Sequence, residues 1–421
     1  MSREMKESGI EWVGTIPANW TVTRNKACFT CGKAIIGADS EKTQLLSLTT
    51  HGVVKKSTEV LSGKLPESFD TYQVVEENNL VMCLFDLDFS AVFSGVSRYN
   101  GMISPAYKVL SCRKNMLPLF ADRWFAFVFD DRKFVHYAKN LRYTLNYNEF
   151  ADLPIIVPPI AEQERISQFL SKECERIDKV IHETKSSISE YKVLKQAVIT
   201  QAVTEGIHGS RSMVKSEHEW IGEYPAEWSQ IKIKWLLNER KERSIHGEEE
   251  PLSMSQKFGL IPTKAMDRVP NMASSFVGAK LVSVGDLVFN KLKAHLGVFA
   301  VSGYDGLVSP DYAVYSTTGV ANLKYLEYLF KTPQYISEFR KKSSGVGAGL
   351  TRLYTDDLYS IYCALPPLDE QLEIVDYLTE QCVEMDKLIA KKEQFLGELE
   401  KYKKSLIYEY VTGKKEVPWD N

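Results

Sequence analysis

Mostly apolar residues recur at heptad spacing in two long stretches of the chain. The first stretch runs from about Ala161 to Glu205 and contains neither glycine nor proline, and the second runs from about Asp369 to Val411 and is interrupted only by Gly397. The seam positions of the first are Ile166, Leu170, Cys174, Ile177, Ile181, Thr184, Ile188 and Tyr191. Those of the second are Ile374, Leu378, Cys382, Met385, Ile389, Lys392 and Leu396, continuing to Leu399. This spacing predicts two long α-helices with one seam each.

The residues that flank these stretches agree with helix boundaries. A pair of prolines precedes each stretch, at 158–159 and at 366–367, and proline is tolerated at the start of a helix but not inside it. Gly206 and Gly413 lie where the seams end, as is usual for the residue after a helix. Each predicted helix is roughly 65 Å long.

The two helices belong to a repeat in which the second half of the chain follows the first at an offset of 208 residues. The opening segment 11–20 recurs at 219–228 with a Trp, a Gly, a Pro and a second Trp at the same spacing. The motif Pro-Pro-[Ile/Leu]-x-Glu-Gln at 158–163 recurs at 366–371. Between these anchors the offset falls to 205–207 and the match weakens. A constant framework therefore carries two inserts that have diverged, and we expect the inserts to determine specificity.

A helix of this length is too long to be covered by one neighbouring insert, so each helix needs a partner. Because the helices have equal lengths and matched seams, we expect them to pair with each other, antiparallel and about an approximate two-fold axis. The alternative is that each helix pairs with another copy of the chain. The expected fold is therefore two mixed α/β globular recognition domains joined by two long helices that form an antiparallel coiled coil, with internal two-fold pseudosymmetry.

The repeat also sets the expected domain boundaries. The first recognition domain comprises residues 1–158, the first helix 159–206, the second recognition domain 207–366 and the second helix 367–413. Residues 414–421 form a short tail.

Composition places the chain among ordinary globular proteins, with 44% hydrophobic and 25% charged residues. The first residues do not form a signal sequence, and no apolar run approaches the roughly 18 residues that a membrane helix requires, so we expect a cytoplasmic protein. Seven cysteines without regular spacing suit a reducing compartment. Cys28 and Cys31 form a lone CxxC pair, for which buried or incidental thiols are favoured over a metal site.

The net charge of −3 hides an uneven distribution. Residues 21–150 carry 16 Lys and Arg against 13 Asp and Glu, and residues 229–357 carry 17 against 13. Both inserts are thus mildly basic, whereas the framework has a net charge of −10. This distribution favours phosphate contacts by the inserts and protein contacts by the framework.

The duplicated opener, the duplicated Pro-Pro-[Ile/Leu]-x-Glu-Gln motif and the helix that follows each copy resemble the specificity subunit of type I restriction-modification systems. The resemblance covers nearly the whole chain. It implies that each insert is a target recognition domain for double-stranded DNA and that the helices dock two methyltransferase subunits. It also implies that the chain binds no cofactor, that S-adenosylmethionine is bound by the partner subunits, and that two translocating nuclease (restriction) subunits can join the complex.

The absence of catalytic motifs from the sequence agrees with a non-catalytic chain. The Pro-Pro pairs lack the preceding Asn or Asp and the following aromatic residue of an adenine methyltransferase motif. The glycine-rich segment 345–349 is followed by Leu-Thr-Arg rather than by the Lys-[Ser/Thr] of a phosphate-binding loop. Ser309-Pro310-Asp311 is not followed by the Glu-x-Lys element of a nuclease. We therefore expect the chemistry to reside in partner subunits.

Three segments of each insert contain the amides, hydroxyls and cations that read base edges and hold phosphates. In the first insert the candidate DNA-binding residues are Thr49, Thr50, His51, Lys139, Arg142, Tyr143 and Asn146. In the second they are Ser255, Gln256, Lys257, Lys291, Lys293, His295, Lys342, Ser343 and Arg352. The middle segment of the first insert, 84–88, is a weaker candidate, because Asp86 and Asp88 repel phosphates and can read only cytosine amino groups. Aromatic residues on the helix expected from Pro118 are interpreted as core.

If the helices hold the inserts apart, each insert meets one half-site, and the half-sites lie about 34 Å apart along one face of the duplex. Since the loops differ, the target is expected to be asymmetric and bipartite with an unread gap. Two other functional classes stay open on sequence alone: a stand-alone DNA-modifying enzyme that dimerises through the helices, and a scaffold that does not bind DNA.

Overall fold

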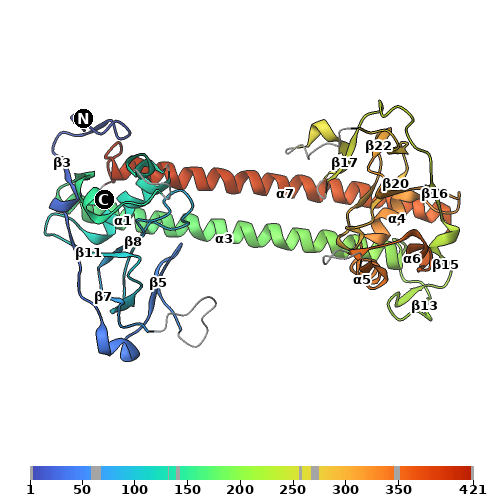
Figure 1. Cartoon of the computed structure of the whole chain (residues 1–421), viewed down its shortest axis with the longest axis horizontal. Coiled ribbons are helices and arrows are strands. Elements are labelled where there is room, and N and C mark those ends of the chain that lie inside the picture. The colour runs from blue at the N-terminus through green and yellow to red at the C-terminus, as the bar shows by residue number, and fades with distance from the viewer. Residues whose placement is uncertain are drawn as a thin grey trace. The chain divides into compact units, whose positions relative to one another are not determined.

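The computed structural model describes residues 3–57, 68–130, 132–138, 143–255, 258–266, 275–345 and 351–418. The chain divides into two compact units. Unit 1 contains residues 1–185 and 394–421, and unit 2 contains residues 186–393. Two long helices, α3 (Ile160–Glu205) and α7 (Leu368–Val411), contribute residues to both units (Figure 1).

Both predicted long helices are present, and their ends lie within two residues of the predicted ends. Gly206 and Gly413 follow them with φ angles of 82° and 69°, in the left-handed region that favours glycine. At Gly413, a Cβ atom would lie 2.5 Å from the side chain of Pro17. Glycine at this position therefore allows the end of α7 to approach the opening segment closely.

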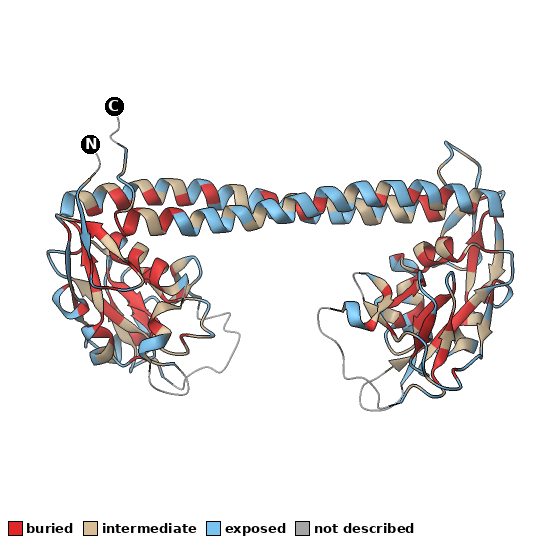
Figure 2. Cartoon of the chain, turned by 90° about the horizontal axis from the view of Figure 1, so that it is seen from above, coloured by how far each residue is buried: buried red, intermediate tan, exposed pale blue. Residues whose placement is uncertain are grey.

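The predicted seams are the sides of α3 and α7 that face the protein interior. In unit 1 Leu170 is fully buried, and in unit 2 Ile374 and Leu378 are fully buried. Figure 2 shows that such buried positions recur along both helices. At two further seam positions, the ammonium of Lys392 lies 5.5 Å from the ring centre of Tyr191.

Ion pairs between α3 and α7 give the relative direction of the helices in each unit. Unit 1 contains Asp178–Lys403 (2.6 Å) and Lys185–Glu400 (3.7 Å), and unit 2 contains Lys192–Glu393 (3.0 Å) and Lys195–Asp386 (2.6 Å). In both units, the residue number of the partner on α7 falls as that of the residue on α3 rises. The two helix segments in each unit are therefore antiparallel.

The globular part of unit 1 is built on an antiparallel four-stranded sheet. Its strands lie in the order β4 (Phe29–Cys31), β11 (Lys108–Cys112), β8 (Leu80–Met82) and β9 (Ser94–Val96). Helix α1 (Pro118–Asp130) packs against β9, and α2 (Tyr147–Asp152) precedes the last strand. Four antiparallel strand pairs complete it: β1 (Met5–Glu7) with β2 (Thr15–Pro17), β3 (Thr21–Arg24) with β12 (Pro154–Val157), β5 (Leu46–Thr49) with β6 (Gly52–Lys55), and β7 (Gln73–Val75) with β10 (Gly101–Ile103).

Unit 2 repeats this plan. Its four-stranded sheet has the order β16 (Leu237–Arg240), β23 (Tyr312–Thr317), β20 (Leu287–Asn290) and β21 (Phe299–Val301). The strand pairs are β13 (Met213–Lys215) with β14 (Glu223–Pro225), β15 (Ser229–Lys232) with β26 (Tyr362–Leu365), β17 (Leu252–Ser255) with β18 (Gly259–Pro262), β19 (Lys280–Val282) with β22 (Gly306–Val308), and β24 (Ser344–Gly345) with β25 (Thr351–Arg352). The helices are α4 (Leu323–Phe330), α5 (Pro333–Lys342) and α6 (Thr355–Tyr359). The predicted mixed α/β fold is therefore confirmed.

The carboxyl-terminal turns of the long helices belong to the hydrophobic cores of the units. The main core of unit 1 includes Leu406, Ile407 and Tyr410 of α7. The main core of unit 2 includes Ala202 and Val203 of α3. Tyr325 of α4 donates a hydrogen bond of 3.0 Å to the carbonyl of Val203. Unit 1 is thus completed by a helix end that is distant in sequence, whereas the helix end in the core of unit 2 directly precedes the strands of that unit.

Candidate nucleic-acid interface

The duplicated framework motif anchors the opening segment of unit 1 to the start of α3. Glu162 accepts a 2.5 Å hydrogen bond from the indole Nε1 of Trp20 and forms an ion pair of 2.6 Å with Arg3. The neighbouring Gln163 accepts from the backbone N–H of Leu117 at 2.8 Å and donates to the carbonyl of Asn115 at 2.9 Å. The glutamate therefore fixes the opener, and the glutamine fixes the turn before α1.

Unit 2 has the same anchor. Glu370 accepts from Trp228 Nε1 at 3.1 Å and pairs with Arg211 at 2.7 Å. Gln371 accepts from the backbone N–H of Asn322 at 2.7 Å, beside the start of α4. The sequence interpretation missed Arg3 and Arg211, although they also stand 208 residues apart.

The anchor in unit 1 stabilises an ionised carboxylate. Burial alone would raise the pKa of Glu162, but hydrogen bonds from Arg3 and Trp20 hold that pKa below its usual value. The guanidinium of Arg3 also lies 5.3 Å from the ring centre of Trp20. The loops that carry the candidate DNA-binding residues are therefore held by a framework that is fixed by charge-assisted hydrogen bonds.

The first candidate segment of unit 1 is the tip of the β5–β6 hairpin. Thr49 pairs with Gly52, and the Thr49 hydroxyl donates to the Gly52 carbonyl at 3.0 Å and accepts from the N–H of His51 at 3.2 Å. Leu48 and Val53 are buried beneath the tip, whereas Thr50 and His51 are exposed. The hairpin therefore presents Thr50 and His51 to solvent from a fixed turn.

The corresponding hairpin of unit 2 joins β17 to β18. Ser255 lies at its tip and accepts a hydrogen bond of 3.2 Å from the N–H of Phe258. Gly259 follows with a φ of 70°, as Gly52 does with a φ of 89° in unit 1. Gln256 and Lys257, which the sequence assigns to this tip, lie outside the described residues.

The middle and last candidate segments of unit 1 meet through their backbones. The N–H of Leu145 donates to the carbonyl of Leu84 at 2.8 Å, and the N–H of Leu87 donates to the carbonyl of Tyr143 at 3.2 Å. Asp86 and Tyr143 have φ angles of 49° and 44°, which are uncommon for residues with a side chain. The two segments therefore form one strained, hydrogen-bonded surface. Lys139 and Arg142 lie outside the described residues.

The equivalent segments also meet in unit 2, where the N–H of Leu353 donates to the carbonyl of Lys291 at 3.0 Å. The Lys291 side chain is only 18% exposed and lies 3.5 Å from Glu239, which also binds Lys280. Burial alone would raise the pKa of Glu239, but hydrogen bonds from Thr355 and Lys280 lower it. Lys291 therefore has a carboxylate partner within the domain.

The other candidates of unit 2 differ in exposure and in their partners. Arg352 pairs with the exposed carboxylate of Asp311 at 2.9 Å, and its Nε has no hydrogen-bond partner among the described residues. Lys293 and Lys342 are exposed. His295 is half-buried, and its Nδ1 likewise lacks a hydrogen-bond partner in the described part of the chain.

Two candidates have a local structural role. The Asn146 side chain accepts from the N–H of Glu149 at 3.0 Å, and the Glu149 carboxylate accepts from the N–H of Asn146, which together form the capping box of α2. The Ser343 hydroxyl donates to the carbonyl of Phe339 at 2.7 Å at the end of α5. Contact of either side chain with DNA stays a prediction.

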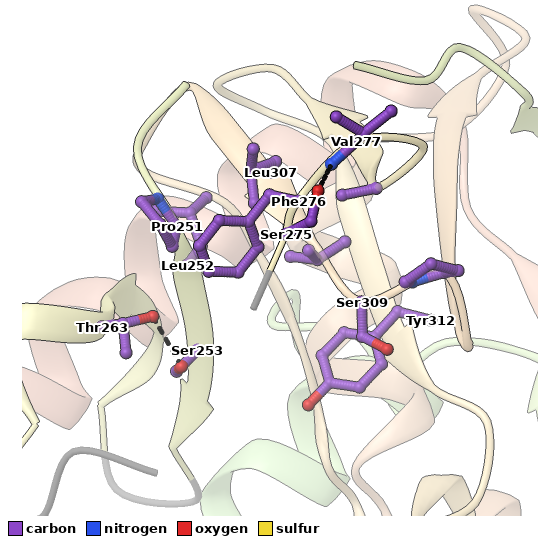
Figure 3. Close-up of a pocket in the computed structure, with 13 residues that line it drawn as sticks. Pro251, Leu252, Ser253, Thr263, Ser275, Phe276, Val277, Leu307, Ser309 and Tyr312 are labelled. Atoms are coloured by element: carbon purple, nitrogen blue, oxygen red, sulfur yellow. Dashed lines mark hydrogen bonds between the residues drawn. The ribbon is translucent and has the colours of Figure 1, made fainter. Parts of the chain in front are cut away.

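A cavity of about 280 Å³ opens beside the β17–β18 hairpin of unit 2 (Figure 3). Its walls combine apolar side chains such as Leu252, Phe276 and Leu307 with the hydroxyls of Ser253 and Tyr312. Among the described residues that line it there is no carboxylate, histidine or cysteine. These side chains do not supply a general acid and base pair.

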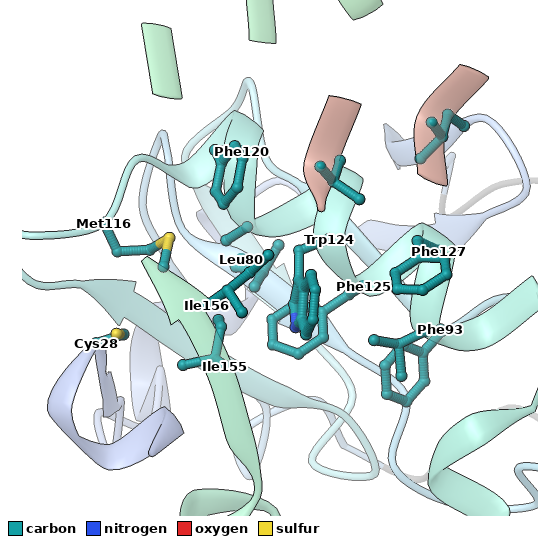
Figure 4. Close-up of a cluster of buried hydrophobic side chains, with 14 of the residues drawn as sticks. Cys28, Leu80, Phe93, Met116, Phe120, Trp124, Phe125, Phe127, Ile155 and Ile156 are labelled. Carbon is teal, nitrogen blue, oxygen red and sulfur yellow. The ribbon is translucent and has the colours of Figure 1, made fainter. Parts of the chain in front are cut away.

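The aromatic residues of α1 belong to the core, as the sequence predicted. Trp124 and Phe125 are fully buried and Phe127 is nearly so (Figure 4). Phe93 packs between Phe125 and Phe129, with ring centres 5.9 and 5.4 Å away. These rings support the loop that follows β8 and are not available to stack on bases.

The seven cysteines are free thiols, and five of them are buried. Burial raises the pKa of Cys28 to about 11 and that of Cys112 to about 12, so both stay protonated near neutral pH. The described residues contain no group of three or more His, Cys, Asp or Glu side chains placed to hold a metal ion. No described helix is long and apolar enough to cross a membrane.

The comparison with curated proteins identifies the relatives of this chain. The MjaX type I restriction enzyme specificity subunit of Methanocaldococcus jannaschii is 27% identical over 283 residues, which are 65% of this chain and 62% of that protein. This chain is similar to type I specificity subunits. The MjaVIII specificity subunit of the same organism is 24% identical over 280 residues, which are 64% of this chain and 63% of that subunit. The chain thus matches less than two thirds of each specificity subunit, and the resemblance inferred from the motifs is confirmed.

Solved structures share the fold of this chain. A chain from a study of complex assembly and conformational transition of the type I system has a TM-score of 0.66 at 14% identity and covers 95% of this chain and 99% of its own length. The HsdS subunit from Thermoanaerobacter tengcongensis has a TM-score of 0.51 at 14% identity. The match covers 95% of this chain and 98% of that subunit. No protein-family model matches the chain.

Proposed function

We propose that this chain is the DNA sequence-specificity subunit of a type I restriction-modification complex. Each insert binds one half of an asymmetric, bipartite target in double-stranded DNA. Two methyltransferase subunits dock on the long helices, bind S-adenosylmethionine, and each methylate an adenine that is flipped out of the duplex. Two restriction subunits, which translocate and cleave DNA, can join the complex outside them. The chain itself catalyses no reaction.

One observation carries this proposal: the two units share an anchored framework but differ in the side chains of equivalent loops. After β8 the loop of unit 1 contains Asp86 and Asp88, whereas after β20 the loop of unit 2 contains Lys291 and Lys293. A common scaffold with different polar groups suits two readers of two different half-sites.

In this proposal, α3 and α7 pair along their lengths as one antiparallel spacer with approximate two-fold symmetry. The recognition domains comprise residues 1–158 and 207–366, the spacer helices 159–206 and 367–413, and the tail 414–421. The ion pairs within each unit support antiparallel pairing. The spacer sets the unread gap, and the half-sites lie about one helical turn, 34 Å, apart.

The candidates with exposed side chains are the first choice for contacts with DNA. In unit 1 these are Thr50, His51 and Tyr143, and in unit 2 they are Lys293 and Lys342. Arg352 joins them because its guanidinium is partly exposed and is held by one exposed carboxylate.

The decisive experiment is to sequence the methylated adenines in the DNA of cells that express this chain together with its methyltransferase subunits. The expected result is a single motif of two unlike half-sites with a fixed gap. Exchange of residues 21–150 for the insert of a relative should then change one half-site only. A change in both half-sites, or in neither, rejects the modular assignment.

A binding assay separates the proposal from the other functional classes. The complex should bind a duplex that contains the mapped motif, and its affinity should fall steeply as salt increases, because phosphate contacts release counterions. Absence of binding at low salt would indicate a scaffold. Methyl transfer by the purified chain alone would indicate a stand-alone enzyme.

A further inference from the structure

Phe89 of unit 1 is exposed to an extent that packing does not explain. Its side chain is 88% exposed, the highest value among the large hydrophobic side chains of the described residues. It lies on the loop between β8 and β9, whose neighbouring residues Leu87 and Phe93 are buried in the core. An isolated exposed apolar residue is ordinary on a protein surface. The backbone that carries Phe89 is unusual.

The loop around Phe89 is held in place by several hydrogen bonds. The carbonyl of Asp86 accepts from the N–H groups of Phe89 at 3.0 Å and Ser90 at 2.7 Å. The guanidinium of Arg132 donates to the carbonyls of Leu87 at 2.7 Å and Ser90 at 3.0 Å.

The residues that hold this loop are themselves constrained. Arg132 lies over the ring of Phe129, 4.1 Å from its centre. Asp86 and Arg132 have φ angles of 49° and 52°, and such strain persists only where the surroundings enforce it. The fold thus holds an exposed phenyl ring on a rigid, strained loop.

Unit 2 presents an apolar side chain at the equivalent position. Leu296 follows Leu287, the first residue of β20, by nine residues, as Phe89 follows Leu80, the first residue of β8. Leu296 is 52% exposed and ends a short 3-10 helix, Ala294–Leu296, against which α5 packs.

This second loop is also fixed by its backbone. The N–H of Leu296 donates to the carbonyl of Lys293 at 2.9 Å, and the N–H of Gly297 donates to that of Ala294 at 2.9 Å. The same loop carries Lys293 and His295. Both domains therefore place one apolar side chain on a fixed loop among the segments assigned to DNA.

We propose that Phe89 and Leu296 are apolar wedges, each of which inserts at a base step of its half-site and partly unstacks it. This inference rests on the proposed function. Side chains of Phe and Leu inserted between base pairs are a known means of kinking DNA and of selecting steps that deform easily. A hydrogen-bonded loop suits this role because its backbone need not be ordered on binding.

The charges around Phe89 favour the bases over the phosphates. Asp86 and Asp88 flank the tip and would be repelled by the DNA backbone, but a carboxylate can accept a hydrogen bond from the amino group of cytosine in a groove. In unit 2, Lys293 can hold a phosphate beside the wedge, so Leu296 is expected to contribute less than Phe89.

The test uses the complex of the full chain with its methyltransferase subunits and a duplex that contains the mapped target. The fluorescent adenine analogue aminopurine replaces in turn each adenine other than the methylated adenine and its immediate neighbours. Its fluorescence rises when a neighbouring base unstacks, and base flipping would raise it at the excluded positions in any case. The variants are Phe89→Ala, Phe89→Leu and Leu296→Ala. The controls are Leu119→Ala, in the first turn of α1, and Val284→Ala, in the turn before β20. The two side chains are 50% and 60% exposed, respectively.

We expect Phe89→Ala to weaken binding about ten-fold and to abolish the fluorescence rise in the first half-site, since a stacked base contributes roughly this much. Phe89→Leu should retain part of both effects. Leu296→Ala should affect the second half-site only, and both controls should bind like the wild type. Thermal unfolding of all variants should be unchanged, because the substituted side chains are exposed.

Wild-type affinity and fluorescence in Phe89→Ala would overturn the wedge while leaving the proposed function intact. Loss of the methyltransferase subunits from Phe89→Ala in gel filtration would also overturn it, because the loop would then be a protein contact. If the wild-type complex fails to bind the duplex, the proposed function fails, and the wedge fails with it.

Discussion

The indole of Trp20 and the carboxylate of Glu162 are joined by a hydrogen bond of 2.5 Å across 142 residues of chain. Trp228 and Glu370 repeat this bond at 3.1 Å and at the same separation in sequence. In each unit the glutamate also binds an arginine, Arg3 or Arg211. The opener therefore packs onto the first turn of a long helix through a carboxylate that satisfies two donors.

Removal of this carboxylate should destabilise unit 1. We expect Glu162→Ala to lower the free energy of unfolding by about 2–3 kcal/mol, because the indole of Trp20 and the guanidinium of Arg3 then lose a partner while still mostly buried. Urea denaturation followed by circular dichroism measures the change. The adjacent exposed Glu164→Ala is the control and should remain within about 0.5 kcal/mol of the wild type. Equal stability of the two variants would show that the anchor is not needed.

Acid should destabilise unit 2 through Glu327. This carboxylate is 5% exposed, accepts a hydrogen bond from the N–H of Val301, and pairs with Lys331 at 2.6 Å and Lys324 at 2.9 Å. Burial alone would raise the pKa of Glu327, but the charges of Lys331 and Lys324 lower it. A lowered pKa in the folded chain contributes stability that is present above the unfolded value, about 4.3, and is lost as the pH falls below it.

The variant Glu327→Gln isolates this contribution. At neutral pH it should be less stable than the wild type by about 2 kcal/mol. Below about pH 4.3 the difference should shrink, because only the wild type has a carboxylate at position 327 that becomes protonated. Urea titrations at several pH values test this, with the exposed Glu248→Gln as control. A difference that is independent of pH contradicts the assignment.

The sequence predicted the long helices, their ends and the aromatic core of α1. The signals for these features, such as heptad spacing, flanking prolines and terminal glycines, lie within short stretches of sequence. The anchors could not be predicted, because Trp20 and Glu162 meet only in the folded chain; the offset that they share with Trp228 and Glu370 was visible, but not the bond. The loop residues were only partly predictable. The sequence placed Asn146 in a candidate DNA-binding segment but did not show that its side chain caps α2, and it gave no reason to single out Phe89.

The two roles assigned to Asn146 can be separated by substitution. Asn146→Ala should lower the free energy of unfolding by about 1 kcal/mol through loss of the cap of α2, whereas Asn146→Ser should preserve the cap. If the amide also contacts DNA, Asn146→Ser should bind the target more weakly despite wild-type stability. Wild-type affinity in Asn146→Ser would assign the residue to the cap alone. Thermal unfolding and fluorescence anisotropy with labelled target provide the two measurements.

Arg352 should contribute to the second half-site only. Arg352→Ala is expected to reduce affinity about 10- to 100-fold, as for loss of a contact to guanine or phosphate. A base contact would relax specificity at one position, whereas a phosphate contact would reduce the salt dependence of binding. Arg24→Ala is the control, since Arg24 likewise pairs with a carboxylate, that of Asp152 at 3.2 Å, and lies outside the candidate segments. An equal effect of both substitutions would mean that only net charge matters.

Arg132 should act as a positioning residue for the loop that carries Phe89. It donates to two carbonyls of that loop with a planar guanidinium, a geometry that lysine cannot reproduce. We expect Arg132→Lys to speed hydrogen exchange at the amides of Phe89 and Ser90 and to weaken target binding, while the anchor of Trp20 stays protected. The exposed Lys114→Arg, which also exchanges the two cations, is the control. If exchange at Phe89 and Ser90 is unchanged in Arg132→Lys, the loop is held by its own backbone and the arginine has no positioning role.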